Sequence, residues 1–288
     1  MNKKRKISVS VVQLDVVLAD IDKNLEKHYE FIEQAIADKH DIIVFPELSL
    51  TGYSLKDAVF DVALSAKDNK FKKILDYSKS ISILLGCVEL TDRYEFYNST
   101  FWFEKGRLLS RHRKVYLPTY GMFEEKRYFS SGNRFRSFDS ELGKFGLLIC
   151  EDMWHPTSAA ILAQDGASVI FVCAAGISRG FSEEMKPQNV QVWETLNRAQ
   201  SVTNTSFVVF ANRVGVEDGL IFWGGSEMLD PSGLRVNKAA YFKEERLNVE
   251  IDLLKLKHAR INTTLLSDEK LNVVIDEFKR IDLIRKEY

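Results

Sequence analysis

The chain begins with an alternating pattern that predicts a strand and then a helix. From Ile7 to Leu14, apolar side chains alternate with small polar ones, as expected of a strand. Asp20 and Asp22 come next and can cap a helix. In that predicted helix the apolar residues are spaced 4, 3 and 4 apart, which places them on one buried stripe: Leu25, Tyr29, Ile32 and Ile36.

Short apolar runs, typical of buried strands, recur along the rest of the chain. They cover residues 42–48, 81–90, 144–150, 168–174, 206–214 and 247–252. Between them we predict helices over residues 56–79, from Pro156 onwards and over residues 183–203. Two strands, 98–106 and 107–115, meet at a turn formed by Lys105 and Gly106, and residues 224–233 resemble a hairpin.

This succession of elements predicts the α/β class. Strands that alternate with helices favour parallel pairing, whereas adjacent strands without a helix between them favour antiparallel pairing. We therefore expect mixed sheets, with two sheets packed face to face. Residues 1–257 are predicted to form one domain. Residues 258–288 are charged and helix-prone, and we expect them to form an arm that packs on this domain or on a second subunit.

Composition narrows the class of partner. Forty basic and 41 acidic side chains give a formal net charge of -1, so no global field is expected to hold nucleic acid, and a small-molecule substrate is favoured. Three widely spaced cysteines suit a reducing cytoplasm rather than a disulfide framework. The start lacks a signal-peptide cleavage pattern and no apolar run could span a bilayer, so neither secretion nor a membrane is expected.

Three ionisable side chains lie where predicted strands end: Glu47, Lys114 and Cys150. Such positions suit reacting groups because a strand fixes the backbone while its end opens into a cleft. Each also has a structural interpretation, as a capping acid, a solvated charge or a small core residue. The hypothesis of a catalytic site therefore depends on the three together.

Cys150 is the candidate nucleophile, because four apolar residues precede it and two acids follow it. A thiol is mostly protonated at neutral pH, so it needs a base or a cation before it can attack an amide carbon. Glu47 could supply the base and Lys114 the cation. Cys87 and Cys173 lie inside apolar runs and are expected to be core residues.

In their order and local contexts, these three residues resemble the Glu-Lys-Cys triad of the nitrilase superfamily of carbon-nitrogen hydrolases. The resemblance covers residues 7–251. The stretches KVYLPTYGMFEEKRYF and CEDMW are similar to the glutamine-hydrolysing domain of glutamine-dependent NAD synthetases. The second, ATP-using domain of such synthetases has no counterpart in these 288 residues, so we do not expect this chain alone to make NAD.

The resemblance implies a four-layer α-β-β-α sandwich, usually dimeric. It assigns Glu47, Lys114 and Cys150 to the triad and Glu125 to a second glutamate that positions the base and the substrate amide, with Glu124 as the alternative. Tyr120 and Glu151 would line the acyl pocket and meet an α-amino group. Specificity is expected to depend on the loops around Tyr120, Ser178 and Trp223.

The implied activity is hydrolysis of a small linear amide through a thioester acyl-enzyme, with release of ammonia. No cofactor is implied, and the five histidines lack the spacing of a metal site. His155, near Cys150, is expected to start a helix rather than to form a Cys-His pair. Two alternatives stay open: a detached glutaminase subunit that supplies ammonia to a separate synthetase, and an inactive paralogue that acts as a scaffold or binding module.

Overall fold

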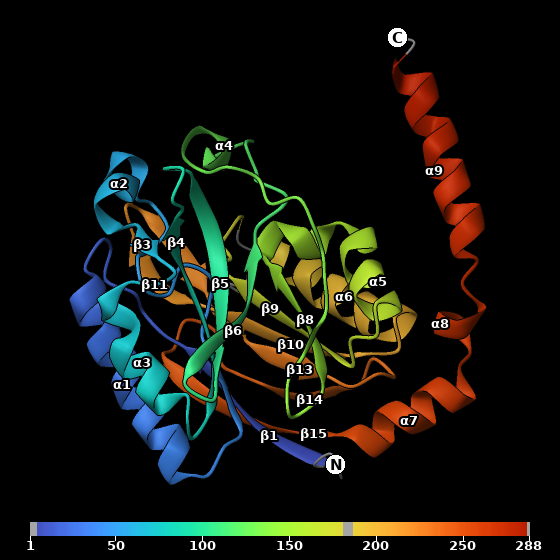
Figure 1. Ribbon diagram of the computed structural model, residues 1–288, viewed down its shortest axis with the longest axis horizontal. Helices are drawn as coiled ribbons and strands as arrows, with labels where there is room; N and C mark the ends of the chain where they lie inside the picture. The colour runs from blue at the N-terminus through green and yellow to red at the C-terminus, as the bar shows by residue number, and fades with distance from the viewer. Residues whose placement is uncertain (1–4, 181–186, 287–288) are drawn as a thin grey trace.

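Two mixed β-sheets face each other at the centre of the molecule, and helices cover the outer face of each (Figure 1). This arrangement is seen in a computed structural model, which describes residues 5–180 and 187–286. The predicted α-β-β-α sandwich is confirmed.

The first sheet contains the N-terminal strand, which lies next to an edge strand. Its order is β15 (Glu245–Asp252), β1 (Lys6–Gln13), β2 (Ile42–Val44), β4 (Ser82–Leu90), β5 (Phe96–Glu104) and β6 (Arg107–Arg113), with the short β3 (Leu64–Ser65) also paired to β4. β1, β2 and β4 are parallel, whereas β15, β5 and β6 join antiparallel. β5 and β6 meet at the predicted turn, where Lys105 and Gly106 both have positive φ.

The second sheet has the order β14 (Arg235–Lys238), β13 (Glu227–Leu229), β10 (Phe207–Asn212), β9 (Val169–Ala174), β8 (Lys144–Ile149) and β7 (Phe138–Asp139). Its central strands β8, β9 and β10 are parallel. β13 and β14 form a hairpin that begins within the range expected, 224–233, but extends to Lys238. β11 (Val214–Glu217) and β12 (Leu220–Trp223) form a separate hairpin.

The alternation in β1 explains why two separate cores form. Val9 and Val11 contribute to the core between the sheets, whereas Val12 belongs to the core beneath α1 (Ile21–Ala37) and α3 (Lys72–Tyr77). Asp20 caps α1 by accepting a hydrogen bond from the Lys23 N–H, as predicted. On the other side, α5 (Pro156–Gln164) and α6 (Gln188–Thr203) cover the second sheet.

The prediction of a single helix over residues 56–79 is wrong. The chain there forms a 3₁₀ turn (Lys56–Ala58), the short α2 (Val59–Val62), β3, a second 3₁₀ turn (Asn69–Phe71) and then α3. Val59 and Phe71 are buried in different apolar clusters, and this packing outweighs the helical preference of the segment. The helix predicted over 183–203 begins at Gln188, and residues 183–186 lie outside the described residues.

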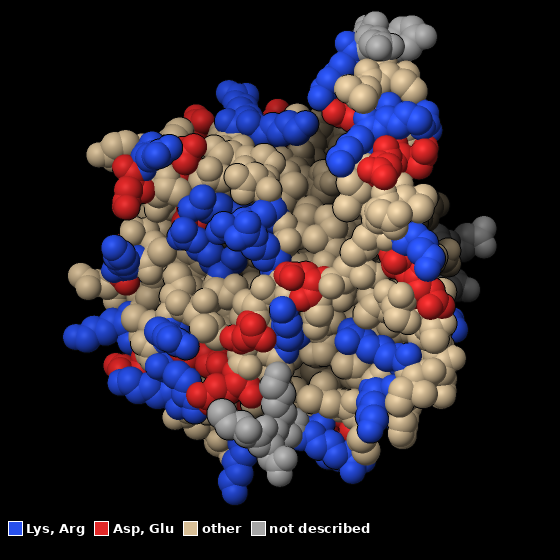
Figure 2. All heavy atoms as spheres, turned by 45° about the vertical axis from the view of Figure 1, so that its right-hand side comes forward, with Lys and Arg blue, Asp and Glu red and all other residues tan. Residues whose placement is uncertain are grey.

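The C-terminal arm consists of α7 (Leu253–Asn262), α8 (Leu265–Asp268) and α9 (Leu271–Lys286). α9 projects away from the sandwich (Figure 1), and every residue of it that is described is exposed. It therefore does not pack on its own domain, and contact with a second subunit stays a prediction. Acidic and basic side chains lie close together along the arm in Figure 2. No helix within residues 5–180 and 187–286 is long and apolar enough to cross a membrane.

Candidate active site

Four predicted site residues lie just beyond ordered elements. Lys114 follows β6 directly, Cys150 follows β8, Glu47 lies three residues after β2, and Glu125 is the first residue of the short helix α4 (Glu125–Tyr128). Because β2 and β6 belong to one sheet and β8 to the other, the two sheets together bring the candidate residues to one end of the sandwich.

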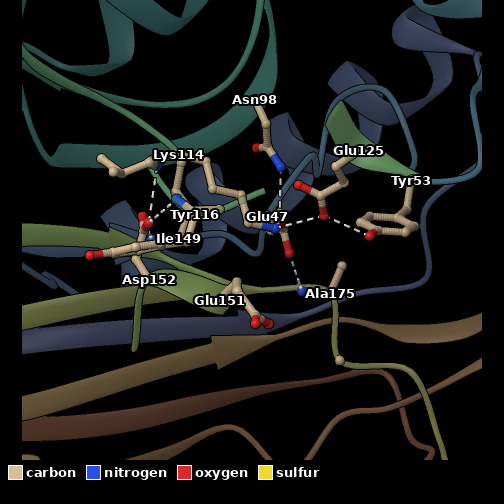
Figure 3. Close-up of polar contacts among 12 residues, drawn as sticks. Glu47, Tyr53, Asn98, Lys114, Tyr116, Glu125, Ile149, Glu151, Asp152 and Ala175 are labelled. Atoms are coloured by element: carbon tan, nitrogen blue, oxygen red, sulfur yellow. Dashed lines mark hydrogen bonds and ion pairs between the residues drawn. The ribbon is translucent and has the colours of Figure 1, made fainter. Parts of the chain in front are cut away.

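Lys114 is the centre of a buried cluster of charges (Figure 3). Its Nζ lies 2.8 Å from Glu47 Oε1 and 2.7 Å from Glu125 Oε1. Lys114 and Glu47 are 0% exposed and Glu125 is 4% exposed. Burial alone would lower the pKa of Lys114, but the Glu125 and Glu47 carboxylates raise it well above its usual value. Lys114 is therefore a permanent cation here and cannot act as the base.

Hydrogen bonds fix the orientation of the Glu47 carboxylate. Its Oε1 also accepts from Asn98 Nδ2 at 2.7 Å, and its Oε2 accepts from the backbone N–H of Ala175 at 2.8 Å. Asn98 lies on β5 in the first sheet, while Ala175 directly follows β9 in the second. Glu47 is therefore held by residues of both sheets, and such a fixed orientation would suit the predicted role of a base.

Glu125 differs from Glu47 in its hydrogen bonding. Its Oε1 accepts from Lys114 and, at 2.6 Å, from the Tyr53 hydroxyl, whereas its buried Oε2 has no partner among the described residues. Burial raises the pKa of Glu125 to about 7 against the opposing effect of Lys114, and Glu47 raises it further. Glu124, the alternative for this position, is exposed, so the residue that meets Lys114 is Glu125.

Cys150 is held in an unusual backbone conformation. It begins a 3₁₀ turn (Cys150–Trp154), and its φ of 45° lies in the left-handed region, which non-glycine residues seldom adopt. Burial and the Glu47 carboxylate raise the pKa of its thiol well above the usual value, although Lys114 opposes this. The thiol is therefore protonated at neutral pH. Cys87 and Cys173 are completely buried.

Asp152 connects the two loops that carry Lys114 and Cys150, and sequence analysis did not identify it. One carboxylate oxygen accepts from the N–H groups of Val115 and Tyr116, each at 3.0 Å. The other accepts from the Ile149 N–H at 3.1 Å and lies 2.8 Å from His112 Nε2. Asp152 is completely buried. These contacts fix the residues next to Lys114 relative to the residue before Cys150.

The residues expected to line the acyl pocket are less buried than the cluster of charges. The Tyr120 hydroxyl donates to both oxygens of Glu151, each at 3.1 Å, and Tyr120 is 48% exposed. Burial and the Glu151 carboxylate raise the pKa of Tyr120 to about 12, so its hydroxyl remains a donor. Ser178 has a buried Oγ without a partner among the described residues.

Aromatic contacts link Tyr120 to the residues around the buried charges, because the Phe123 ring makes edge contacts with both Tyr120 and Tyr53. Tyr53 makes edge contacts with Phe123 and Phe222, with ring centroids 6.3 and 6.2 Å apart. Trp223, beside Phe222, is buried, and the two glycines that follow it have positive φ.

The histidine near the candidate nucleophile packs against an aromatic ring. His155 precedes α5 as predicted, and its ring stacks on Tyr116 with centroids 3.4 Å apart. Across the part of the chain that the structure describes, no group of three or more His, Cys, Asp or Glu side chains could hold a metal ion.

Three contributors were missed by sequence analysis: Tyr53, Asn98 and Asp152. Tyr53 and Asn98 lie in stretches rich in turn or strand residues, where one polar side chain carries little information. Asp152 offers a clearer signal, since an acid two residues after a nucleophile in a strand-to-helix turn can accept from the surrounding backbone N–H groups.

The chain is similar to known proteins over most of its length. The carbon-nitrogen hydrolase family matches residues 8–261. The chain is 31% identical to the glutamine-dependent NAD(+) synthetase of Acinetobacter baylyi over 90% of its own length, but it covers only 46% of that protein. It is 32% identical to the (R)-stereoselective amidase of a Pseudomonas species, with 92% of each chain covered.

Among solved structures, a carbon-nitrogen hydrolase from Helicobacter pylori G27 superimposes with a TM-score of 0.84 at 27% identity, covering 96% of this chain and 99% of that one. The chain thus spans less than half of the synthetase it resembles in sequence, and nearly all of the amidase and of this hydrolase. On the extent of these matches, the protein belongs to the carbon-nitrogen hydrolase family, within the nitrilase superfamily.

Proposed function

We propose that the protein hydrolyses a small linear amide through a thioester on Cys150 and releases ammonia. The observation that carries this proposal is the buried contact of Lys114 with both Glu47 and Glu125. A lysine that stays charged cannot remove a proton but can stabilise a developing oxyanion. Beside a thiol that stays protonated, a buried carboxylate is then the available base.

In the first half of the reaction, Glu47 takes the thiol proton while the sulfur attacks the carbonyl carbon. Lys114 Nζ and the backbone N–H of Glu151, the residue after the nucleophile, stabilise the oxyanion. The C–N bond then breaks, and the leaving nitrogen takes the proton from Glu47, which gives ammonia and the thioester. The Oε2 of Glu125, for which no described residue supplies a donor, could accept a hydrogen bond from the substrate NH₂ group.

In the second half, Glu47 removes a proton from water, and the resulting hydroxide attacks the thioester carbon. The C–S bond breaks, the carboxylic acid is released, and the sulfur recovers the proton from Glu47. One base thus serves both halves. A reduced thiol is needed throughout, which agrees with the cytoplasmic location that we propose.

An amide panel that includes glutamine tests this function. We expect ammonia release with at least one amide and a mass increase on Cys150 that corresponds to the acyl group. A Cys150→Ala variant should give neither. If wild-type protein releases no ammonia and forms no adduct with any member, the hydrolase proposal fails and the alternative of an inactive scaffold is favoured.

A detached glutaminase subunit is the alternative activity, and its support is the similarity to NAD synthetase. It uses the same site but requires a separate synthetase as partner. Addition of a candidate synthetase should leave the glutaminase rate unchanged if the protein is a free amidase. Stimulation of that rate would favour the subunit instead.

A further inference from the structure

Four arginines line a cavity at the edge of the first sheet. The cavity has a volume of about 560 Å³ and lies between β6, the last strand of that sheet, and the loop of residues 132–137. Arg111 and Arg113 line it from β6, and Arg134 and Arg136 line it from the loop. Among the described residues that line it there is no acid. Since the formal net charge of the whole chain is -1, this is a local concentration of positive charge.

A buried carboxylate holds the two arginines of β6 in place. Glu89 is 1% exposed, and it accepts from Arg111 Nη1 at 2.7 Å and from Arg113 Nε and Nη2 at 2.9 and 2.7 Å. The Arg113 guanidinium also lies over the Tyr97 ring, 4.0 Å from its centroid. A guanidinium has five N–H donors, and Glu89 takes only one from Arg111 and two from Arg113. The other donors of both groups remain for an acceptor in the cavity.

The loop opposite β6 is fixed at both ends. At its start, the Gly132 N–H donates to the carbonyl oxygen of Lys114 at 2.8 Å. A Cβ on Gly132 would lie only 2.2 Å from the carbonyl oxygen of Arg113, so this close approach requires glycine. At the other end, the N–H and the hydroxyl of Ser137 each donate to Asp165 Oδ2 at 2.7 Å. A loop anchored in this way loses less conformational entropy when a ligand binds.

The acids near the cavity offset only part of its charge. Glu89 carries one negative charge against Arg111 and Arg113. The hydrogen bonds from Ser137 lower the pKa of Asp165, and Arg136 lowers it further. These two acids can balance at most two of the four guanidinium charges, and the remaining positive potential would attract an anion into the cavity.

We propose that this cavity binds a small molecule that carries phosphate, with Arg111 and Arg113 on one side of the phosphate and Arg134 and Arg136 on the other. An arginine pairs with phosphate through two parallel N–H donors, and a phosphate group offers three acceptor oxygens where a carboxylate offers two. Arginines on two facing walls therefore suit a phosphate or diphosphate group better than a single carboxylate. The cavity volume lies within the range of about 300–1,000 Å³ that is usual for small-molecule sites.

The competing explanation is that the arginines only protect the edge of β6. Charged side chains on an edge strand discourage pairing with a strand of another chain. That role requires charge, but it requires neither a ligand nor a defined arrangement of donors. It therefore predicts weak attraction of any anion, reduced equally by the loss of any two surface arginines.

Calorimetric titration of the full chain with pyrophosphate in a low-salt buffer tests the site. We expect one equivalent to bind per chain. Replacing both Arg134 and Arg136 with Met should weaken the Kd about 10- to 100-fold, because hydrogen bonds between charged groups are lost. Replacing both with Lys keeps the charge but not the paired donors, so the Kd should lie between those of the wild type and the Met variant.

Arg93→Met combined with Arg285→Met is the matched control, because both arginines are exposed, neither lines the cavity, and the same charge is removed. This control should change the Kd for pyrophosphate by less than about twofold, since distant surface charges are screened. Equal weakening by the two Met double variants would show general attraction and overturn the site. Failure of the wild type to bind pyrophosphate at millimolar concentration would also overturn it.

Thermal melting gives a second readout that does not depend on hydrolase activity. Pyrophosphate should raise the Tm of the wild type and of the control, because a ligand that binds the folded state stabilises it. The Arg134 and Arg136 Met variant should melt like the wild type without pyrophosphate and gain less with it. Tighter binding of a single-stranded oligonucleotide than of pyrophosphate would assign the four arginines to a nucleic-acid partner and contradict the small-molecule site.

Discussion

At the scale of single residues, Glu125 is the group in the site whose pKa lies near neutral pH. Its pKa is raised to about 7, and its Oε1 accepts from both Lys114 and Tyr53. A carboxylate can accept these bonds and also one from a substrate NH₂ group, whereas a protonated acid loses acceptor capacity. The ionised form, which predominates above about pH 7, is therefore the form that we expect to bind substrate.

This assignment predicts the pH profile of kcat/KM. In the wild-type protein, kcat/KM should rise with pH through about 7 as Glu125 loses its proton. Glu125→Gln should abolish that acid limb and lower kcat/KM, because an amide cannot ionise. Glu124→Gln, which alters the exposed neighbour, should keep the wild-type profile. An acid limb that persists unchanged in Glu125→Gln would assign the titration to another group.

At the scale of secondary-structure elements, the site depends on the connection between the end of β6 and the end of β8. Asp152 makes that connection with hydrogen bonds to backbone groups on both sides. Asp152→Asn would turn one oxygen into an NH₂ group. Depending on how the amide is oriented, either the Ile149 N–H or the N–H groups of Val115 and Tyr116 would lose their acceptor. The variant should therefore lose alignment of Lys114 with Cys150 as well as folding stability.

We expect Asp152→Asn to lower kcat about 10- to 100-fold, since small displacements of reacting groups are costly. The free energy of unfolding should fall by about 1–3 kcal/mol. Steady-state kinetics and denaturant titration measure the two effects. Asp165→Asn is the matched control, because Asp165 accepts from Ser137 in an exposed position. A loss of stability with kcat unchanged would limit Asp152 to a purely structural role.

Much of this organisation could be predicted from sequence where the signal is local. The alternation in β1, the Asp20 cap and the strand-end positions of Glu47 and Lys114 all depend on neighbours in the chain. The contacts of Asp152 do not, since its partners Val115 and Tyr116 are 37 and 36 residues away. The prediction of one helix over residues 56–79 failed for the same reason. Parts of this segment pack into separate apolar clusters that are formed with residues distant in sequence.

At the scale of the whole molecule, α9 has an apolar face that is exposed in the described structure. Five apolar side chains that are 36% to 54% exposed lie on one side of the helix: Leu271, Val274, Ile275, Phe278 and Ile281. Contiguous exposed apolar surface of this kind usually marks an interface. The predicted homodimer or higher oligomer would cover it.

Light scattering coupled to size-exclusion chromatography tests this prediction. The full chain should elute with at least twice the mass of a monomer, and replacing both Ile275 and Phe278 with Asp should lower that mass, because charge on an interface opposes burial. The control Lys279→Asp introduces the same side chain beside the apolar stripe and should retain the assembly. A monomeric wild-type protein would contradict the prediction.

The left-handed backbone of Cys150 has a consequence for choosing an inactive reference protein. A side chain with a Cβ costs about 1 kcal/mol in that conformation, whereas glycine adopts it freely. Cys150→Gly should therefore melt at a higher temperature than Cys150→Ala, although both lack the sulfur. The difference in Tm between the two variants, measured by calorimetry, gives the stability cost of a residue with a Cβ at this position. Alanine, which retains the backbone strain, is the fairer reference for activity.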